Sequence, residues 1–134
     1  MVCLYCGGKT EIYNSRSQRA SNSTWRRRRC LACGATFSSI ESLAYGSSLA
    51  LQNGTSHIVP FQRDVLFLSL YEACRHRKHP IADATALAGT VVGKLLKKQT
   101  KGLLTREEII KTASTALKQF DHAAYVQYLA YHPL

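Results

Sequence analysis

Two Cys-x-x-Cys pairs constrain this 134-residue chain more than any other feature of its sequence. The pairs are Cys3 with Cys6 and Cys30 with Cys33, and a glycine follows each pair. Two residues between thiolates let one tight turn direct both sulfurs at a single ion, and glycine permits the positive φ that such a turn needs. Four thiolates form the tetrahedral set that suits zinc. The spacing therefore predicts one closed, structural zinc site with no open position for catalysis.

A redox dithiol is the alternative interpretation of a Cys-x-x-Cys pair. It requires one pair on a thioredoxin-like unit, whereas here two matched pairs bracket a short segment that reads as strand-poor. Neither the N-terminal "MVCLYCGGK" nor the apolar run at 81–96 resembles a signal peptide or a membrane span. We therefore expect no membrane association and a reducing cytoplasm, where paired cysteines bind metal. The fifth cysteine, Cys74, lies in an apolar helical pattern and is expected to be buried.

Four consecutive arginines, Arg26, Arg27, Arg28 and Arg29, lead directly into the second cysteine pair. They end a segment, 11–29, that reads as two short strands around a polar loop. Side chains alternate along a strand, so the first and third arginines should face one way and the second and fourth the other. A ribbon of this size has little interior, and both faces should meet solvent or a partner.

The charge balance indicates an anionic partner. The chain has 18 Lys and Arg against 8 Asp and Glu, a net charge of +10, which fits nucleic acid, anionic lipid or nucleotide. Phosphate binding by arginine forks explains the density of the run. The alternatives are a merely solvated charge run and a partial offset of the negative metal site. Trp25, just before the run, either covers the small core or stacks on a base.

The rest of the chain predicts a second domain. A small, polar stretch at 41–48 marks a boundary between domains at 1–44 and 45–134, and Asn53-Gly54 predicts a β-hairpin. Helical periodicity then predicts helices at 61–77, 83–99, after the capping box "TREE" that starts at Thr105, and after a cap at Asp121. The residues expected to face the core are Leu66, Leu70 and Cys74 in the first helix, Ala84, Leu87, Val91 and Leu95 in the second, Ile109, Ala113, Ala116, Leu117 and Phe120 in the third, and Tyr125, Tyr128 and Leu129 in the fourth.

No catalytic constellation emerges from the sequence. The stretch "GTVVGKLL" at 89–96 lacks the spacing of a phosphate-binding loop, and it lies inside a helix rather than after a strand. The histidines are scattered along the chain, and no Ser-His-Asp order or zinc-protease motif is present. We therefore do not expect an enzyme.

The order of these parts resembles the NrdR-type transcriptional repressors of bacterial ribonucleotide reductase genes. Those proteins join an N-terminal zinc ribbon to an ATP-cone that senses ATP and dATP. "VCLYCG" resembles the family's first knuckle, "NSR" at 14–16 stands where the family has Asp-Ser-Arg, and "WRRRRCLACGATFSSIE" resembles its arginine run and second knuckle. Pro60-Phe61 and "DHAAYVQYLAY" follow the order of the ATP-cone.

The resemblance implies site residues in both domains. In the ribbon it implies DNA contacts by Arg16 and by the arginine run 26–29. In the cone it implies a nucleotide site, for which the candidates here are Leu51, Gln52, Arg63 and Tyr128. The cone is divergent. Leu51 and Gln52 stand where the family has lysine before the hairpin turn, and Val65 and Gln127 replace a lysine and an arginine.

Together these observations predict an α+β fold: a small β zinc ribbon, then a β-hairpin with a four-helix, ATP-cone-like domain. The function expected from the resemblance is a zinc-dependent repressor that binds double-stranded DNA, self-associates and responds to ATP or dATP in the bacterial cytoplasm, bound to the nucleoid when on DNA. The alternative is a degenerate paralogue that binds DNA through the ribbon and uses the cone only for oligomerisation or protein contacts.

Overall fold

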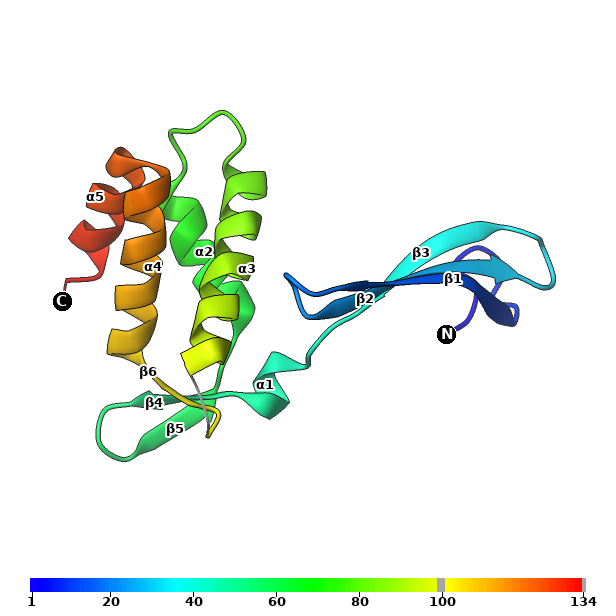
Figure 1. The fold of residues 1–134 in the computed structure, drawn as a ribbon, viewed down its shortest axis with the longest axis horizontal. Helices are drawn as coiled ribbons and strands as arrows, with labels where there is room; N and C mark the ends of the chain where they lie inside the picture. Colours follow the sequence, from blue (N-terminus) through cyan, green and yellow to red (C-terminus); the bar gives the residue numbers. More distant parts are fainter. Residues whose placement is uncertain (99–100, 134) are drawn as a thin grey trace. The chain divides into compact units, whose positions relative to one another are not determined.

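The computed structural model describes residues 1–98 and 101–133 and has the predicted α+β fold. The chain forms two compact units, residues 1–43 and 44–134 (Figure 1). Each unit has a hydrophobic core of its own. Across the described ranges, no helix combines the length and the apolar character needed to cross a membrane.

The first unit is a three-stranded antiparallel sheet in the order β1-β2-β3. The strands β1 (Thr10–Gln18) and β2 (Ser23–Cys30) are the two predicted from the sequence. The third, β3 (Thr36–Glu41), was not predicted, and the interpretation of this region as strand-poor is wrong. The sequence "TFSSIE" does not alternate apolar with polar residues, so β3 lacks the pattern that identifies a half-buried strand.

The core of the first unit is very small. Its buried side chains are Cys3, Cys30 and Phe37, with Ala35 packed against them. A domain of this size cannot bury enough apolar surface to be stable on that basis alone, and such domains depend on a metal or on disulfides.

A small sheet opens the second unit. After the short helix α1 (Tyr45–Ser48), β4 (Ala50–Asn53) and β5 (His57–Pro60) form the predicted hairpin. A third strand, β6 (Leu103–Thr105), pairs in parallel with β4 and gives the order β5-β4-β6. Neither α1 nor β6 was predicted, because segments of four and three residues show no periodicity.

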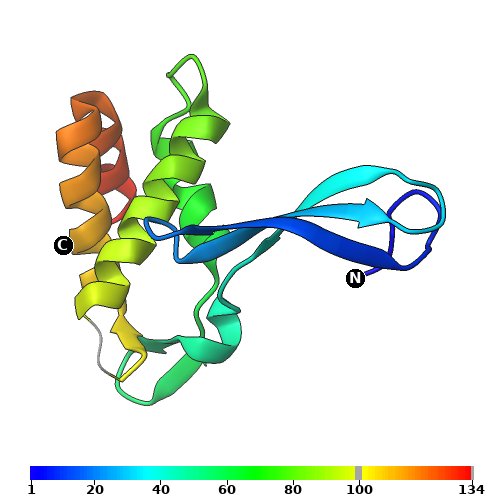
Figure 2. The same cartoon turned by 45° about the vertical axis from the view of Figure 1, so that its right-hand side comes forward.

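Four longer helices follow the hairpin, as the sequence predicted. They are α2 (Arg63–Ala73), α3 (Pro80–Lys98), α4 (Arg106–Phe120) and α5 (His122–Tyr131). The helix α2 contacts α3 and α5, and α4 contacts the same two helices, so the four form a bundle (Figures 1 and 2).

Three helix boundaries differ from the prediction. The helix α2 spans Arg63–Ala73 rather than 61–77, and α3 begins at Pro80 rather than Asp83. Proline is favoured in the first turn of a helix because the N–H it lacks has no partner within the helix there. The predicted end of this helix at Gln99 lies outside the described residues.

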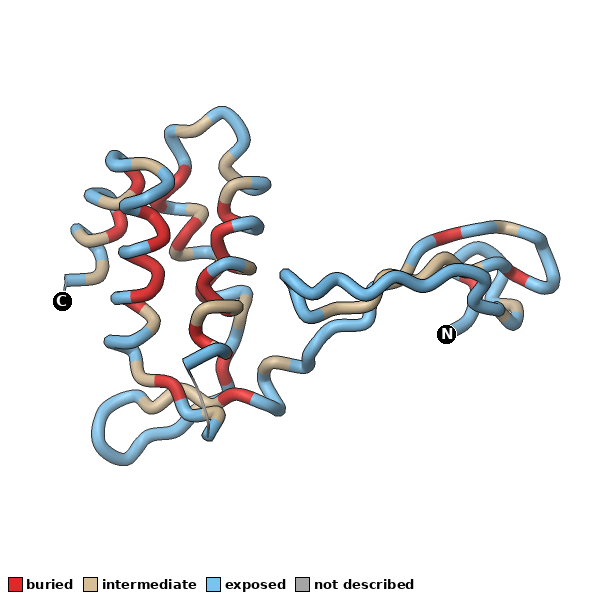
Figure 3. Tube along the Cα trace, viewed as in Figure 1, coloured by how far each residue is buried: buried red, intermediate tan, exposed pale blue. Residues whose placement is uncertain are grey.

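The predicted core positions of α2 and α3 are all buried (Figure 3). The prediction for α4 is partly wrong. Ala113, Ala116 and Leu117 are buried, but Ile110 rather than Ile109 completes the buried face. Phe120 is 41% exposed, and the Arg77 guanidinium lies 4.3 Å from the centre of its ring. A cation–π contact therefore replaces the predicted burial of this ring.

Asp121 links three parts of the helical bundle. Its carboxylate caps α5 by accepting the Ala124 backbone N–H at 3.0 Å, and it accepts Arg77 Nη1 at 2.6 Å. Arg77 also donates from Nε to Asp83 at 2.7 Å, near the start of α3. The Ala124 N–H, followed by Arg77, holds the pKa of the Asp121 carboxyl well below its usual range.

We expect Asp121→Ala to destabilise the helical unit more than Asp121→Asn. Asparagine still caps a helix but cannot pair with Arg77 as a charge, so the extra loss in the alanine variant should be about 1 kcal/mol. Because folding lowers the carboxyl pKa, the ionic contribution is present above the unfolded pKa of about 3.9 and is lost as pH falls below it. Urea unfolding monitored by helical circular dichroism should show wild type and Asp121→Asn converging in acid. A gap that is independent of pH would contradict this role.

Candidate metal centre and nucleic-acid interface

The two Cys-x-x-Cys turns have the same backbone geometry. In the first, the Gly7 N–H donates to the Cys3 carbonyl at 2.9 Å, and in the second the Gly34 N–H donates to the Cys30 carbonyl at 3.1 Å. The two glycines have φ of 72° and 71°, in the left-handed region that glycine adopts without strain. The sequence prediction of paired turns ending in glycine is confirmed.

The four sulfurs of Cys3, Cys6, Cys30 and Cys33 all lie within 4.8 Å of one another. The Cys3 and Cys33 sulfurs are 3.8 Å apart, and those of Cys6 and Cys30 are 3.4 Å apart. Zinc–sulfur bonds of about 2.3 Å in a tetrahedron place sulfurs about 3.8 Å apart, so the site fits zinc. The four cysteines are therefore positioned to bind one structural zinc ion.

Backbone N–H groups point at the sulfurs. Tyr5 N–H lies 3.4 Å from Cys3 Sγ, Gly8 N–H lies 3.4 Å from Cys6 Sγ, and Cys33 N–H lies 3.4 Å from Cys30 Sγ. The last of these contacts is the main reason that the pKa of the Cys30 thiol is lowered to about 6. At Cys6 the Gly8 N–H also acts to lower the pKa, but the contacts with the other cysteine sulfurs outweigh it and raise the pKa of that thiol to about 12. The backbone N–H contacts favour the thiolate, which is the form that binds metal.

Gly8 is a site residue that sequence reasoning missed. A Cβ at this position would lie 3.0 Å from the Ala32 Cβ, 3.1 Å from the Cys6 sulfur and 3.2 Å from the Cys30 sulfur. Gly8 therefore lets the two turns approach closely, and the doubled glycine in "CGG" was its signal. The fifth cysteine, Cys74, is fully buried in the helical unit as predicted, and burial raises the pKa of its thiol.

The register of the ribbon places successive arginines on opposite faces. Arg27 lies opposite Asn14 on β1 and Ser38 on β3, whereas Arg28 lies opposite Ile12 and Phe37. Directly opposed residues of antiparallel strands share a face. The predicted alternation of the arginine run is therefore present.

We call one face the Trp25 face and define it by Tyr13, Arg16, Trp25, Arg27 and Arg29. The Arg16 guanidinium lies 6.0 Å from the centre of the Trp25 ring, and that of Arg29 lies 5.4 Å from the centre of the Tyr13 ring. Arg27 donates from Nε to the Tyr13 hydroxyl at 3.2 Å. Neutral partners orient these guanidinium groups without cancelling their charge.

The opposite face carries Arg26 and Arg28. Arg26 forms an ion pair with Glu41 at 3.3 Å, and Arg28 donates to the Ser39 hydroxyl at 3.0 Å. Phe37, on this face, packs with the buried cysteines. Since Trp25 lies on the other face and is half-buried, the aromatic ring that covers the small core is Phe37.

Two of the four candidate nucleotide residues, Leu51 and Tyr128, line one cavity, and the other two, Gln52 and Arg63, are not among the residues that line it. Leu51 and Tyr128 line a cavity of about 640 Å³, which we call the hairpin cavity, between the β4–β5 hairpin and helices α2, α4 and α5. Gln52 alternates with Leu51 and lies opposite Ile58 in the hairpin register. Arg63 donates to the Thr85 carbonyl of α3 at 3.3 Å. Arg106, which the sequence analysis placed only in a capping box, lines the hairpin cavity.

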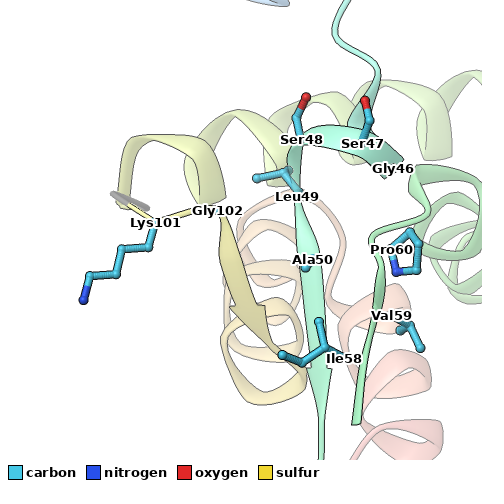
Figure 4. A pocket seen from close by; sticks show the side chains of 10 residues that line it. All are labelled: Gly46, Ser47, Ser48, Leu49, Ala50, Ile58, Val59, Pro60, Lys101 and Gly102. Carbon is cyan, nitrogen blue, oxygen red and sulfur yellow. The ribbon is translucent and has the colours of Figure 1, made fainter.

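A second hollow of about 350 Å³ lies on the small sheet (Figure 4). Its walls include Ser47, Ser48, Ile58 and Pro60, and the side chain of Lys101 points away from the other labelled groups. Among its described lining residues Lys101 is the single charged one, so the hollow offers little chemistry for binding.

Comparisons with known proteins agree with the geometry of the ribbon. Residues 1–41 match the family model described as "Transcriptional repressor NrdR-like, N-terminal domain". The chain is 29% identical over 131 residues to the transcriptional repressor NrdR of Symbiobacterium thermophilum, covering 96% of this chain and 84% of that protein. It is 31% identical over 131 residues to NrdR of Sphingopyxis alaskensis, covering 96% and 82%. It is 32% identical over 131 residues to NrdR of Rhizobium meliloti, covering 96% and 81%.

We expect purified protein to contain about one zinc ion per chain, as a four-thiolate site implies. Cys30→Ser should release the metal and unfold the ribbon, because metal binding and folding are coupled in domains with so small a core. Elemental analysis of purified variants measures this, with Cys74→Ala as the control that keeps its zinc. Stoichiometric zinc in the Cys30 variant would rule out the assignment.

Proposed function

The chain belongs to the NrdR family of transcriptional repressors, and on this basis we propose that it represses ribonucleotide reductase genes by binding double-stranded DNA through its zinc ribbon. The proposal places the protein in the bacterial cytoplasm, on the nucleoid when bound. The metal holds the turns that flank the sheet, and the sheet presents the DNA-binding groups.

The observation that carries this proposal is the composition of the Trp25 face. Arg16, Arg27 and Arg29 lie together there. The strand residues of that face include one carboxylate, that of Glu11, which lies opposite Arg29 in the register. Arginine dominates contacts to phosphate oxygens and to the guanine edge. The Trp25 and Tyr13 rings add surfaces that can stack on sugar or base.

The opposite face suits DNA less well. Arg26 already has a carboxylate partner in Glu41, and Arg28 lies over the strand that carries the buried Phe37. We therefore assign the principal phosphate contacts to Arg16, Arg27 and Arg29, with Arg26 and Arg28 adding to the long-range positive potential.

One ribbon makes too few contacts for specific repression. Specific protein–DNA interfaces bury about 1,000–2,500 Å² of protein surface, and repeated operator sites are matched by symmetric oligomers. We propose that the second unit joins copies of the chain into a homo-oligomer, so that two or more ribbons contact one operator.

We further propose that the hairpin cavity is the site at which adenine nucleotides, ATP or dATP, regulate this assembly. Its volume of about 640 Å³ and its position under the hairpin support a small-molecule site. A nucleotide that binds one assembly more tightly than another shifts the population toward it and so changes DNA affinity. Because Leu51 and Val65 present apolar groups to the cavity, we expect ATP and dATP to bind more weakly than in relatives with lysines.

Replacing Arg27 and Arg29 by alanine should weaken DNA binding and flatten its salt dependence. Each lost phosphate contact should reduce the slope of log affinity against log salt by about 0.9, so the double variant should lose about two units. The matched control is the Arg26→Ala/Arg28→Ala variant, which removes the same charge from the opposite face and should change the slope less. Fluorescence anisotropy with a labelled duplex, on variants that retain zinc, measures both.

Equal losses in the two variants would refute the assignment to the Trp25 face. An unchanged slope in both would show that the run serves the fold or the metal. Regulation of ribonucleotide reductase genes is tested separately, with duplexes from upstream of those genes and coding-region duplexes of equal length. Equal affinity for the two sets would contradict the proposed target.

A further inference from the structure

Four lysines gather at the C-terminal end of α3. Lys94, Lys97 and Lys98 lie in the last two turns of the helix, and Lys101 follows the end of the helix. Residues three and four apart share a face of a helix, so Lys94 has Lys97 and Lys98 as its neighbours on the surface. We call Lys94, Lys97, Lys98 and Lys101 the α3 lysine patch. All but Lys94 are exposed, and Figure 4 shows the Lys101 side chain pointing away from the other labelled residues.

The chain does not neutralise this patch. The sequence contains no Asp or Glu between Asp83 and Glu107. Asp83, in the first turn of α3, lies about 16 Å from Lys94 along the helix axis and accepts a hydrogen bond from Arg77. In the part of the chain that the structure describes, the ion pairs are formed by arginine and histidine, and none involves a lysine.

The carboxylates at the start of α4 have other contacts. The helix α4 contacts α3 and carries Glu107 and Glu108 in its first turn. The Glu108 carboxylate accepts the Thr105 N–H in the capping box, and Glu107 lines a surface hollow with Arg106 and Lys111. The α3 lysine patch therefore keeps its positive charge.

The helix dipole explains only part of this arrangement. Cations are favourable in the last turn of a helix, which accounts for Lys97 and Lys98, but the effect falls off within that turn. It does not account for Lys94, which lies one turn earlier, or for Lys101, which lies beyond the end of the helix.

A glycine precedes Lys94 inside the helix. Glycine weakens a helix interior, so its presence there requires a packing reason. The described chain supplies none, because a Cβ on Gly93 would meet no atom within 4 Å. The missing side chain instead leaves room for a partner to approach the backbone of α3 beside Lys94 and Lys97.

We infer that the α3 lysine patch binds phosphates of the DNA backbone, so that the second unit adds sequence-independent contacts to those of the ribbon. This inference rests on the proposed DNA-binding function and extends it to the second unit. Lys94 and Lys98 are about 6 Å apart along the helix axis, and each DNA strand carries one charge per about 3.4 Å of duplex axis. One turn of α3 thus spans about two phosphates. Phosphate contacts by lysine, a compact point charge, carry no sequence information.

An anionic lipid surface is the competing partner for a basic helix. A helix that lies on a membrane inserts an apolar face into it. The apolar face of α3, which includes Leu87, Val91 and Leu95, is buried in the core of the second unit. The face that a membrane requires is therefore already occupied, which favours DNA.

Replacing Lys97 and Lys98 by glutamine tests the inference in the full-length, zinc-loaded protein. Each lost contact should reduce the slope of log affinity against log salt by about 0.9, so the double variant should lose about 1.8. At about 50 mM salt, affinity should fall about tenfold for each lost contact. The factor should be the same on two duplexes of equal length and unrelated sequence, because their phosphates are alike. Fluorescence anisotropy measures both quantities.

Two further variants separate phosphate contact from net charge and from folding. Lys111→Gln/Lys118→Gln removes the same charge from exposed positions of α4 in the same unit and should reduce the slope less. Lys97→Arg/Lys98→Arg keeps the charge and should restore the wild-type slope. Circular dichroism checks that each variant retains its helices.

Acetylation of lysine provides an independent measure of contact. A saturating duplex should protect Lys97 and Lys98 from an amine-reactive acetylating reagent, whereas Lys111 and Lys118 should stay reactive. Mass spectrometry of samples with and without the duplex measures the protection at each site.

The outcomes separate this inference from the proposed function. If the wild type binds no duplex, both are wrong. If the wild type binds DNA and the Lys97→Gln/Lys98→Gln variant keeps its slope, or loses no more than the α4 control, the inference is overturned and the ribbon proposal stands. The inference is also overturned if the duplex leaves Lys97 and Lys98 as reactive as before. Loss of binding to anionic lipid vesicles alone would assign the patch to a membrane surface and overturn it as well.

Discussion

The first unit depends on its four cysteine sulfurs. Its buried side chains are two of those cysteines and Phe37, so no hydrophobic core exists there that could hold three strands on its own. The sulfurs converge within 4.8 Å because two tight turns bring them together. A zinc ion bound here would join the start of the chain to the end of β2, where Cys30 pairs with Thr10 of β1. The metal thus supplies the constraint that a larger domain obtains from packing.

That constraint also explains the four consecutive arginines before the second cysteine pair. Cys30 ends β2, and its position in the metal site fixes which residues of that strand face which way. With the register set, Arg27 and Arg29 turn toward Tyr13, while Arg26 turns toward Glu41. A run that appears uniform in sequence is divided into two chemically different surfaces. One surface keeps its positive charge, and the other is partly neutralised and adjoins the small core.

The parts of the fold that could be predicted are those with a local physical signature. Cysteine spacing identified the metal site, the sequence around Thr105 identified a capping box, and Asn53-Gly54 identified the hairpin. The parts that could not be predicted depend on tertiary pairing. The strand β6 has three residues and exists because it pairs with β4. The cavity position of Arg106 follows from that pairing and has no signal in the local sequence.

The parallel pairing of β4 with β6 has a mechanical consequence. Thr105, the last residue of β6, pairs with Gln52 of the hairpin, and the next residue is Arg106. Leu51 of β4 and Arg106, which both line the hairpin cavity, are therefore attached to one sheet. Any force that lifts the hairpin must either break the bonds between β4 and β6 or pull on the first turn of α4. The helix α4 then acts as a rod that carries the displacement to its far end, where Asp121 is joined to Arg77.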